Sequence, residues 1–155
     1  MQAHRPFAPG PLGYVAAAGL ALPVAAVAWF EAVYLCFGLT GENPSTTFRY
    51  TAAVAAIGLA LGWPLHGAAR PAEVVRRGCQ LGLLVSLLLP VVAMAVLLLW
   101  QSASDRPDLG MGGLILYNLP VVTFGVATIL AIAFKIGSQL AGRRLQSTNE
   151  SEKSQ

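Results

Sequence analysis

Long apolar segments recur along the chain, separated by short polar segments rich in glycine, proline and charged residues. Each apolar segment is near or above the ~20 residues that a helix needs to cross a ~30 Å hydrocarbon core. Apolar and polar residues do not alternate at period two within them, as the strands of a membrane barrel require. Helices are then the remaining structure that satisfies the backbone in lipid. We therefore predict spanning helices at about residues 12–38, 47–66, 79–100 and 113–135.

The composition favours an integral membrane protein over a water-soluble one. Of the 155 residues, 55% are hydrophobic and 11% are charged, and the mean hydropathy is +0.63. Such a chain has too little polar surface to cover a soluble globule. Residues 1–145 are predicted to form one all-α domain, an integral membrane four-helix bundle, followed by a disordered polar tail at residues 146–155. The lipid bilayer is the first partner that this composition predicts.

Most of the basic residues fall on one side of the predicted bundle. With four spans, the amino terminus, the loop near residue 70 and the carboxyl tail share a side. That side holds Arg5, Arg70, Arg76, Arg77, Lys135, Arg143, Arg144 and Lys153, and the other side holds Arg49 and Arg106. By the positive-inside rule, both termini are predicted to be cytoplasmic, in a multi-pass protein of the bacterial inner membrane.

The first apolar segment also has features of a secretion signal. Arg5 precedes an apolar run that contains Ala26-Val27-Ala28, a small-residue sequence of the kind at which signal peptides are cut. The apolar sequence continues past this point to Leu39, as in an uncleaved span. An uncleaved first helix is the favoured interpretation, and cleavage is the alternative.

Small residues at spacing four mark surfaces where helices can pack closely. Lipid tails are as apolar as leucine, so membrane helices associate through close backbone approach and shared polar groups. The residues with this spacing are Gly58 and Gly62, Gly78 and Gly82, and Ala17, Ala21 and Ala25. We predict that they are helix-packing positions, either within the bundle or between copies in a homo-oligomer.

Glu31 is the charged residue that interrupts the apolar segments. An acid in lipid is costly and usually has a task. Counting inward at 1.5 Å per residue puts Glu31 roughly 10 Å below the outer end of its helix, with Tyr117 and Asn118 of the fourth helix at a similar level. Tyr34 lies one turn outward on the same face. These side chains are therefore predicted to lie near one another.

Arg49 would complete a polar cluster near the outer end of the bundle. It lies in the first turn of the second helix, where a cation opposes the helix dipole, so we expect an acidic partner, either Glu31 or Glu42. The cluster of Glu31, Tyr34, Arg49, Tyr117 and Asn118 has three interpretations. It fixes the register of the helices, it recognises another membrane protein, or it makes Glu31 a proton or cation site. A lone acid without a second deep ionisable group is a poor proton relay, which favours the first two.

Sequence motifs for catalysis and cofactor binding are missing. The chain has no HExxH, no paired cysteine ligand set, no nucleophile elbow and no phosphate loop. We therefore expect no enzyme activity, no cofactor and no metal site. The basic residues lie at the ends of the spans, which favours lipid headgroups over nucleic acid as their partners.

The favoured hypothesis is a non-enzymatic protein that binds another membrane protein or a membrane-inserted segment. Accessory subunits and immunity proteins against membrane-acting toxins share this general architecture. The analogy concerns the arrangement of helices and rests on no shared sequence motif. The alternative is an oligomeric transporter of a small solute or ion that uses Glu31. Of the two hypotheses, only the transporter requires Glu31 to gain and lose a proton during function.

Overall fold

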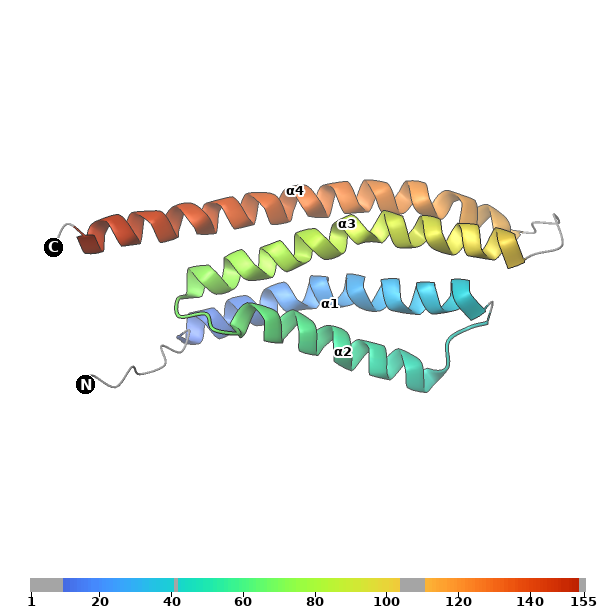
Figure 1. Ribbon diagram of the computed structural model, residues 1–155, viewed down its shortest axis with the longest axis horizontal. Helices are drawn as coiled ribbons and strands as arrows, with labels where there is room; N and C mark the ends of the chain where they lie inside the picture. The colour runs from blue at the N-terminus through green and yellow to red at the C-terminus, as the bar shows by residue number, and fades with distance from the viewer. Residues whose placement is uncertain (1–9, 41, 104–110, 154–155) are drawn as a thin grey trace.

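The computed structural model describes residues 10–40, 42–103 and 111–153, with side chains described for residues 10–40, 42–102 and 118–147. The described residues are almost entirely α-helical (Figure 1). The helices are α1 (Pro11–Thr40), α2 (Thr46–Leu65), α3 (Pro71–Ala103) and α4 (Met111–Lys153). All four are long and apolar enough to cross a membrane. The predicted all-helical class is therefore confirmed.

The bounds of α3 and α4 differ from the predicted spans. α3 begins at Pro71, eight residues before the predicted span, because proline fits the first helical turn and no second proline interrupts residues 72–79. α4 continues to Lys153, through residues that were expected to form a disordered tail. No proline or glycine follows Gly142, and glutamine, glutamate and lysine are good helix formers, so nothing there ends the helix.

α3 is the central helix of the fold (Figure 1). It packs against α1 on one side and α4 on the other, while α2 packs mainly against α1 and touches α3 less extensively. Within the described ranges, α4 makes no close backbone approach to α1 or α2. The bundle is therefore open, with α2 and α4 at its two edges.

Close contacts at small residues define how the helices are aligned. A Cβ atom on Gly38 would lie 3.0 Å from Val96, and one on Gly78 would lie 3.0 Å from Leu20. The two partners are 58 residues apart in both pairs, so α1 and α3 run parallel in a constant register. α4 runs antiparallel to α3, and α1 therefore begins at the end of the molecule where α4 finishes (Figure 1).

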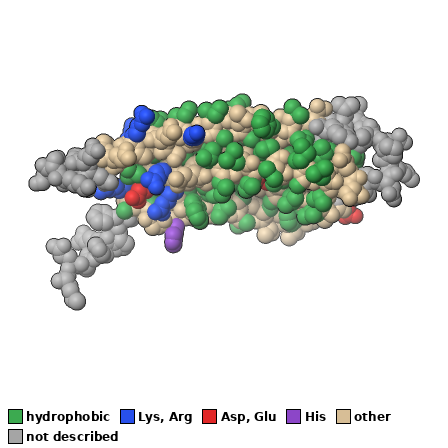
Figure 2. All heavy atoms as spheres, turned by 45° about the horizontal axis from the view of Figure 1, so that its top comes forward, with side chains coloured by type: hydrophobic (Ala, Val, Ile, Leu, Met, Phe, Trp, Pro, Cys, Tyr) green, Lys and Arg blue, Asp and Glu red, His purple; other side chains and the backbone are tan. Residues whose placement is uncertain are grey.

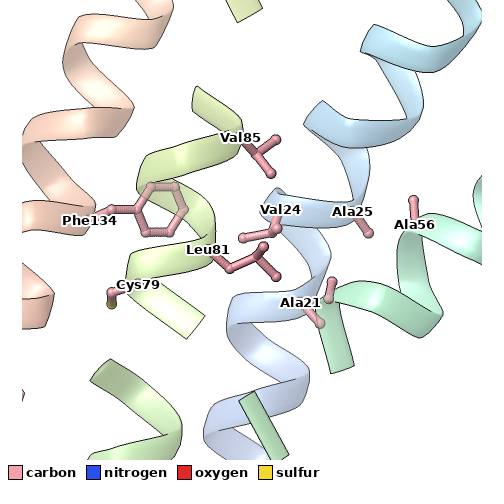
Figure 3. Packing of buried hydrophobic residues seen from close by; sticks show 9 residues of the cluster. Ala21, Val24, Ala25, Ala56, Cys79, Leu81, Val85 and Phe134 are labelled. Carbon is pink, nitrogen blue, oxygen red and sulfur yellow. The ribbon is translucent and has the colours of Figure 1, made fainter. Parts of the chain in front are cut away.

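The core combines a close alanine contact with a layer of larger side chains. Ala17, Ala21 and Ala25 are buried on α1, as their spacing predicts, and Ala21 and Ala25 belong to one cluster with Ala56 and Ala60 of α2. Alanine lets the two backbones approach closely. The larger side chains of the same cluster come from α1, α3 and α4, and they include Val24, Leu81, Val85 and Phe134 (Figure 3).

The turn between α2 and α3 is held by side-chain bonds to its backbone. Gly67 has a φ of +64°, a left-handed conformation that glycine adopts readily. Arg77 donates from Nη1 to the His66 carbonyl, and Glu73 accepts a hydrogen bond from the Ala69 amide at 2.9 Å. Glu73 and Arg77 are four residues apart, a spacing at which helical side chains can pair, but both side chains bind this turn instead.

Basic side chains gather at the end of the molecule that holds the α2–α3 turn. Figure 2 shows Lys and Arg side chains concentrated there, while hydrophobic side chains cover the middle of the visible face. The arginines on this end of the described chain are Arg70, Arg76, Arg77, Arg143 and Arg144. Arg49 is the basic residue described at the opposite end, in the first turn of α2.

Candidate functional site

Glu31 lies on the face of α1 that packs against α3. Ala17, Val24, Glu31 and Gly38 follow one another at intervals of seven residues, which places them on one side of the helix. The α1–α3 register puts Glu31 level with Leu89. Its Oε1 atom is fully shielded from solvent and has no hydrogen-bond partner among the described residues. Buried polar atoms are nearly always bonded, so this oxygen is the least satisfied group in the helical core.

Arg49 does not pair with Glu31 or with Glu42. Its Nε atom donates to the Pro44 carbonyl at 3.0 Å, and its own carbonyl accepts a hydrogen bond from Trp29 Nε1 at 2.9 Å. Arg49 therefore ties the start of α2 to the preceding loop and to α1. The expected acidic partner was wrong, because a backbone carbonyl five residues earlier is within reach of the side chain.

Of the other members of the predicted cluster, Tyr34 contacts aromatic neighbours on its own helix. The Tyr34 ring stacks on Phe30, with 5.1 Å between the ring centroids, and it also contacts Phe37 at 6.1 Å. Asn118 is exposed on α4 and has an interaction of its own. Tyr117 belongs to α4, but its side chain lies outside the described part of the structure.

The predicted cluster also depends on the position of α4. The prediction counted depth from the ends of two helices and assumed that they lie side by side. α4 instead packs on the far side of α3. Between α1 and α4 a shallow apolar groove of about 330 Å³ remains. It is lined by Ala26, Val27, Phe30, Leu89, Leu119, Val122, Thr123 and Val126. Thr123 donates its hydroxyl to the Leu119 carbonyl at 2.8 Å, so the groove offers little polar chemistry.

The two glycine pairs have opposite surroundings. Gly78 and Gly82 are buried, and a Cβ atom on Gly82 would lie 2.6 Å from the Phe134 ring. Gly58 and Gly62 are exposed, and a Cβ atom on either would have nothing within 4 Å. The first pair packs helices within the chain, whereas the second pair leaves a bare stretch of the α2 backbone on the surface.

That bare stretch lines a groove between α2 and α3, which we call the α2 groove. Its volume is about 620 Å³, and it is lined by Gly58, Leu59, Gly62, Trp63, His66, Arg77 and Gln80. The glycines and Leu59 make one end apolar. His66, Arg77 and Gln80 make the other end polar, close to the α2–α3 turn. The arrangement combines close backbone access with groups that can form hydrogen bonds.

A basic pocket at the same end of the molecule was missed by the sequence analysis. It lies between α3 and α4 and contains Arg76, Gln139, Arg143 and Gln146. The sequence signal was present, since residues 139, 143 and 146 follow helical spacing on one face of α4. The arginines were used only to orient the chain, because the pairing of α3 with α4 was not known.

No known protein family, curated protein or solved structure matches this chain. Among the described residues, no three of His, Cys, Asp and Glu gather closely enough to hold a metal ion.

Proposed function

We propose that this chain is a multi-pass membrane protein of the bacterial inner membrane, with both termini in the cytoplasm, and that it binds a transmembrane helix of another protein. Four apolar helices support the membrane location. The arginines at the end with the α2–α3 turn support the orientation, because basic residues are enriched on the cytoplasmic side.

The observation that carries the binding proposal is the exposure of Gly58 and Gly62 along the α2 groove. Within lipid, helices gain little from apolar contact alone, and close backbone approach supplies much of their attraction. Gly78 and Gly82 show this contact already made inside the chain, against Leu20 and Phe134. Gly58 and Gly62 offer the same kind of surface without a described helix upon it.

The partner that suits this groove is an apolar helix with a polar group near its cytoplasmic end. The helix would cross the Gly58 and Gly62 backbone, and its polar group would meet His66 and Gln80. An accessory subunit bound to a larger membrane protein fits this description. An immunity protein that captures the inserted helix of a membrane-acting toxin fits it equally, and a second copy of the chain is the homo-oligomeric case.

Substitution of Gly62 tests the binding proposal. In Gly62→Ile, the branched side chain fills the bare surface, so we expect at least about a tenfold loss of partner recovered after crosslinking and purification from membranes. The measurement compares each variant with the parent chain by quantitative mass spectrometry. Gly125→Ile is the matched control, since Gly125 is an exposed glycine of α4 with open space around it.

The result also separates the kinds of partner. If the crosslinked partner is a second copy of this chain, the α2 groove is the interface of a homo-oligomer. If Gly62→Ile retains every partner that the parent chain retains, the α2 groove is not the binding surface.

Thiol labelling tests the membrane orientation. In a chain with Cys36 and Cys79 replaced by serine, Asn43→Cys and Ser147→Cys each provide a single exposed thiol at opposite ends of the molecule. We expect a membrane-impermeant maleimide to label the Asn43→Cys variant in intact spheroplasts, and the Ser147→Cys variant only after permeabilisation. The opposite pattern would reverse the orientation, and labelling of both in intact spheroplasts would contradict four spans.

A second candidate function is proton or cation movement at Glu31. The observation that favours it is the buried Oε1 atom without a hydrogen-bond partner in the described structure. Because the helices are packed in an open row around α3, a path past Glu31 would require a second copy of the chain to close it. Partner binding is the better supported function, since the α2 groove needs no further component to form.

A further inference from the structure

The basic pocket lies where α3 begins and α4 passes beyond the apolar part of the fold. Its volume is about 470 Å³. A Cβ atom on Gly137 would lie 2.9 Å from the Cys79 sulfur, which sets the level of α4 against α3. Arg76, one turn before Cys79, is therefore level with the stretch of α4 that carries Gln139 and Arg143. Side chains from two separate helices thus meet in one pocket.

The lining of the pocket is positively charged and has unused hydrogen-bond donors. Arg76 and Arg143 contribute two guanidinium groups, Gln139 and Gln146 contribute two amides, and none of the described residues that line the pocket is acidic. Neither arginine forms an ion pair with another residue of the described structure. The nearby carboxylate of Glu73 already accepts the Ala69 amide. Two like charges held together in this way favour an anion between them.

The geometry of these groups suits a phosphate. A guanidinium group can donate two parallel hydrogen bonds to phosphate oxygens, and amide groups can donate further hydrogen bonds to the remaining oxygens. Leu145 also lines the pocket, and Ile136 and Leu140 are exposed beside it on α4, at 52% and 57% of their surface. An apolar strip directly next to a phosphate-sized basic pocket matches a molecule that has both a phosphate and a hydrocarbon chain.

We propose that Arg76, Gln139, Arg143 and Gln146 bind the phosphate of an anionic phospholipid in the cytoplasmic leaflet, with an acyl chain along Ile136 and Leu140. This site rests on the membrane location and orientation in the proposed function. It does not depend on the α2 groove, which lies along α2 and contains different residues. The bound lipid bridges α3 and α4 at the end where α4 leaves the bundle.

The test uses the full chain in nanodiscs that contain phosphatidylcholine with a trace of fluorescent phosphatidylglycerol. Energy transfer from tryptophan to the labelled lipid measures its enrichment around the protein. A basic residue near a membrane surface contributes about 1 kcal/mol, or about fivefold in affinity, so Arg76→Gln and Arg143→Gln are each expected to reduce enrichment about fivefold. The double variant is expected to lose about twentyfold or more. Lys135→Gln is the matched control, because Lys135 is an exposed cation of α4 outside the pocket.

Four outcomes would overturn the inference. An equal loss in Lys135→Gln would show that diffuse charge attracts the lipid, and displacement of the lipid by millimolar inorganic phosphate would assign the pocket to a soluble anion. A parent chain that enters nanodiscs and binds its protein partner, yet shows no lipid enrichment, would remove this site alone. A chain that cannot enter nanodiscs at all would remove the proposed function together with it.

Discussion

Gly82→Ala is expected to lower the free energy of unfolding by about 1–3 kcal/mol, as overpacking of a close-packed core does. The added Cβ atom would lie 2.6 Å from two atoms of the Phe134 ring and 2.8 Å from a third. The ring points from α4 into the cluster formed with Leu81 and Val85, and only 8% of Phe134 is exposed, so it has little room to turn aside (Figure 3). Either the ring moves off its rotamer or α4 moves away from α3.

Unfolding in mixed micelles, followed by circular dichroism as the fraction of denaturing detergent rises, measures the effect. Gly125→Ala should change the free energy of unfolding by less than about 0.5 kcal/mol, because its new methyl group meets nothing within 4 Å. The double variant Gly82→Ala with Phe134→Leu should recover part of the loss, since the smaller side chain leaves room for the methyl group. Full stability in Gly82→Ala alone would contradict the α3–α4 alignment.

The second large effect is expected at Glu31 and has the opposite sign. Glu31→Leu should raise the free energy of unfolding by about 1–3 kcal/mol, because a buried polar atom without a hydrogen-bond partner carries a penalty of that order. The Oε1 atom has no such partner in the described structure, so its removal breaks no bond at that oxygen. Leucine also suits a helix face that carries Val24, a buried residue of the apolar core, and that lies level with Leu89.

The same unfolding measurement applies to Glu31→Leu, with Glu42→Leu as the control because Glu42 is exposed at the end of the molecule. A loss of stability would instead assign Glu31 the register-fixing role that the sequence suggested. Proton flux into liposomes then separates the two candidate functions. A partner-binding protein should give no more flux than protein-free liposomes, whereas flux in the parent that disappears in Glu31→Gln would favour the transporter.

The helices themselves could be predicted from the sequence because their causes are local. Length and continuous hydrophobicity determine where a chain can span lipid, and the observed α1 and α2 differ from the predicted spans by two residues or fewer at each end. Ser45, a residue type that commonly caps helices, precedes α2 and accepts a hydrogen bond from the Phe48 amide at 3.2 Å. The end of α4 was not predicted, because a polar composition alone does not stop a helix that contains no breaker.

The pairing of the helices could not be predicted, because it depends on which apolar faces meet. Gly58 and Gly62 have the same spacing as Gly78 and Gly82, yet one pair is bare and the other is buried. Nothing in either helix alone distinguishes a surface that packs within the chain from one that faces outward. The polar cluster around Glu31 depends on the same unknown, since its members were aligned by depth without knowledge of the helix order around α3.

The parallel contact of α1 with α3 has a consequence for the synthesis of this protein. In the proposed topology α2 emerges directly after α1 and can cover the alanine face at Ala21 and Ala25 at once. The face that carries Glu31 must wait, because its partner positions lie 58 residues later in the chain. α1 therefore enters the bilayer with an uncovered acid, and a translation pause before α3 would prolong that exposed state. In the described part of the chain, the α4 backbone approaches that of α3 alone, so α4 can join last without separating the helices that have already paired.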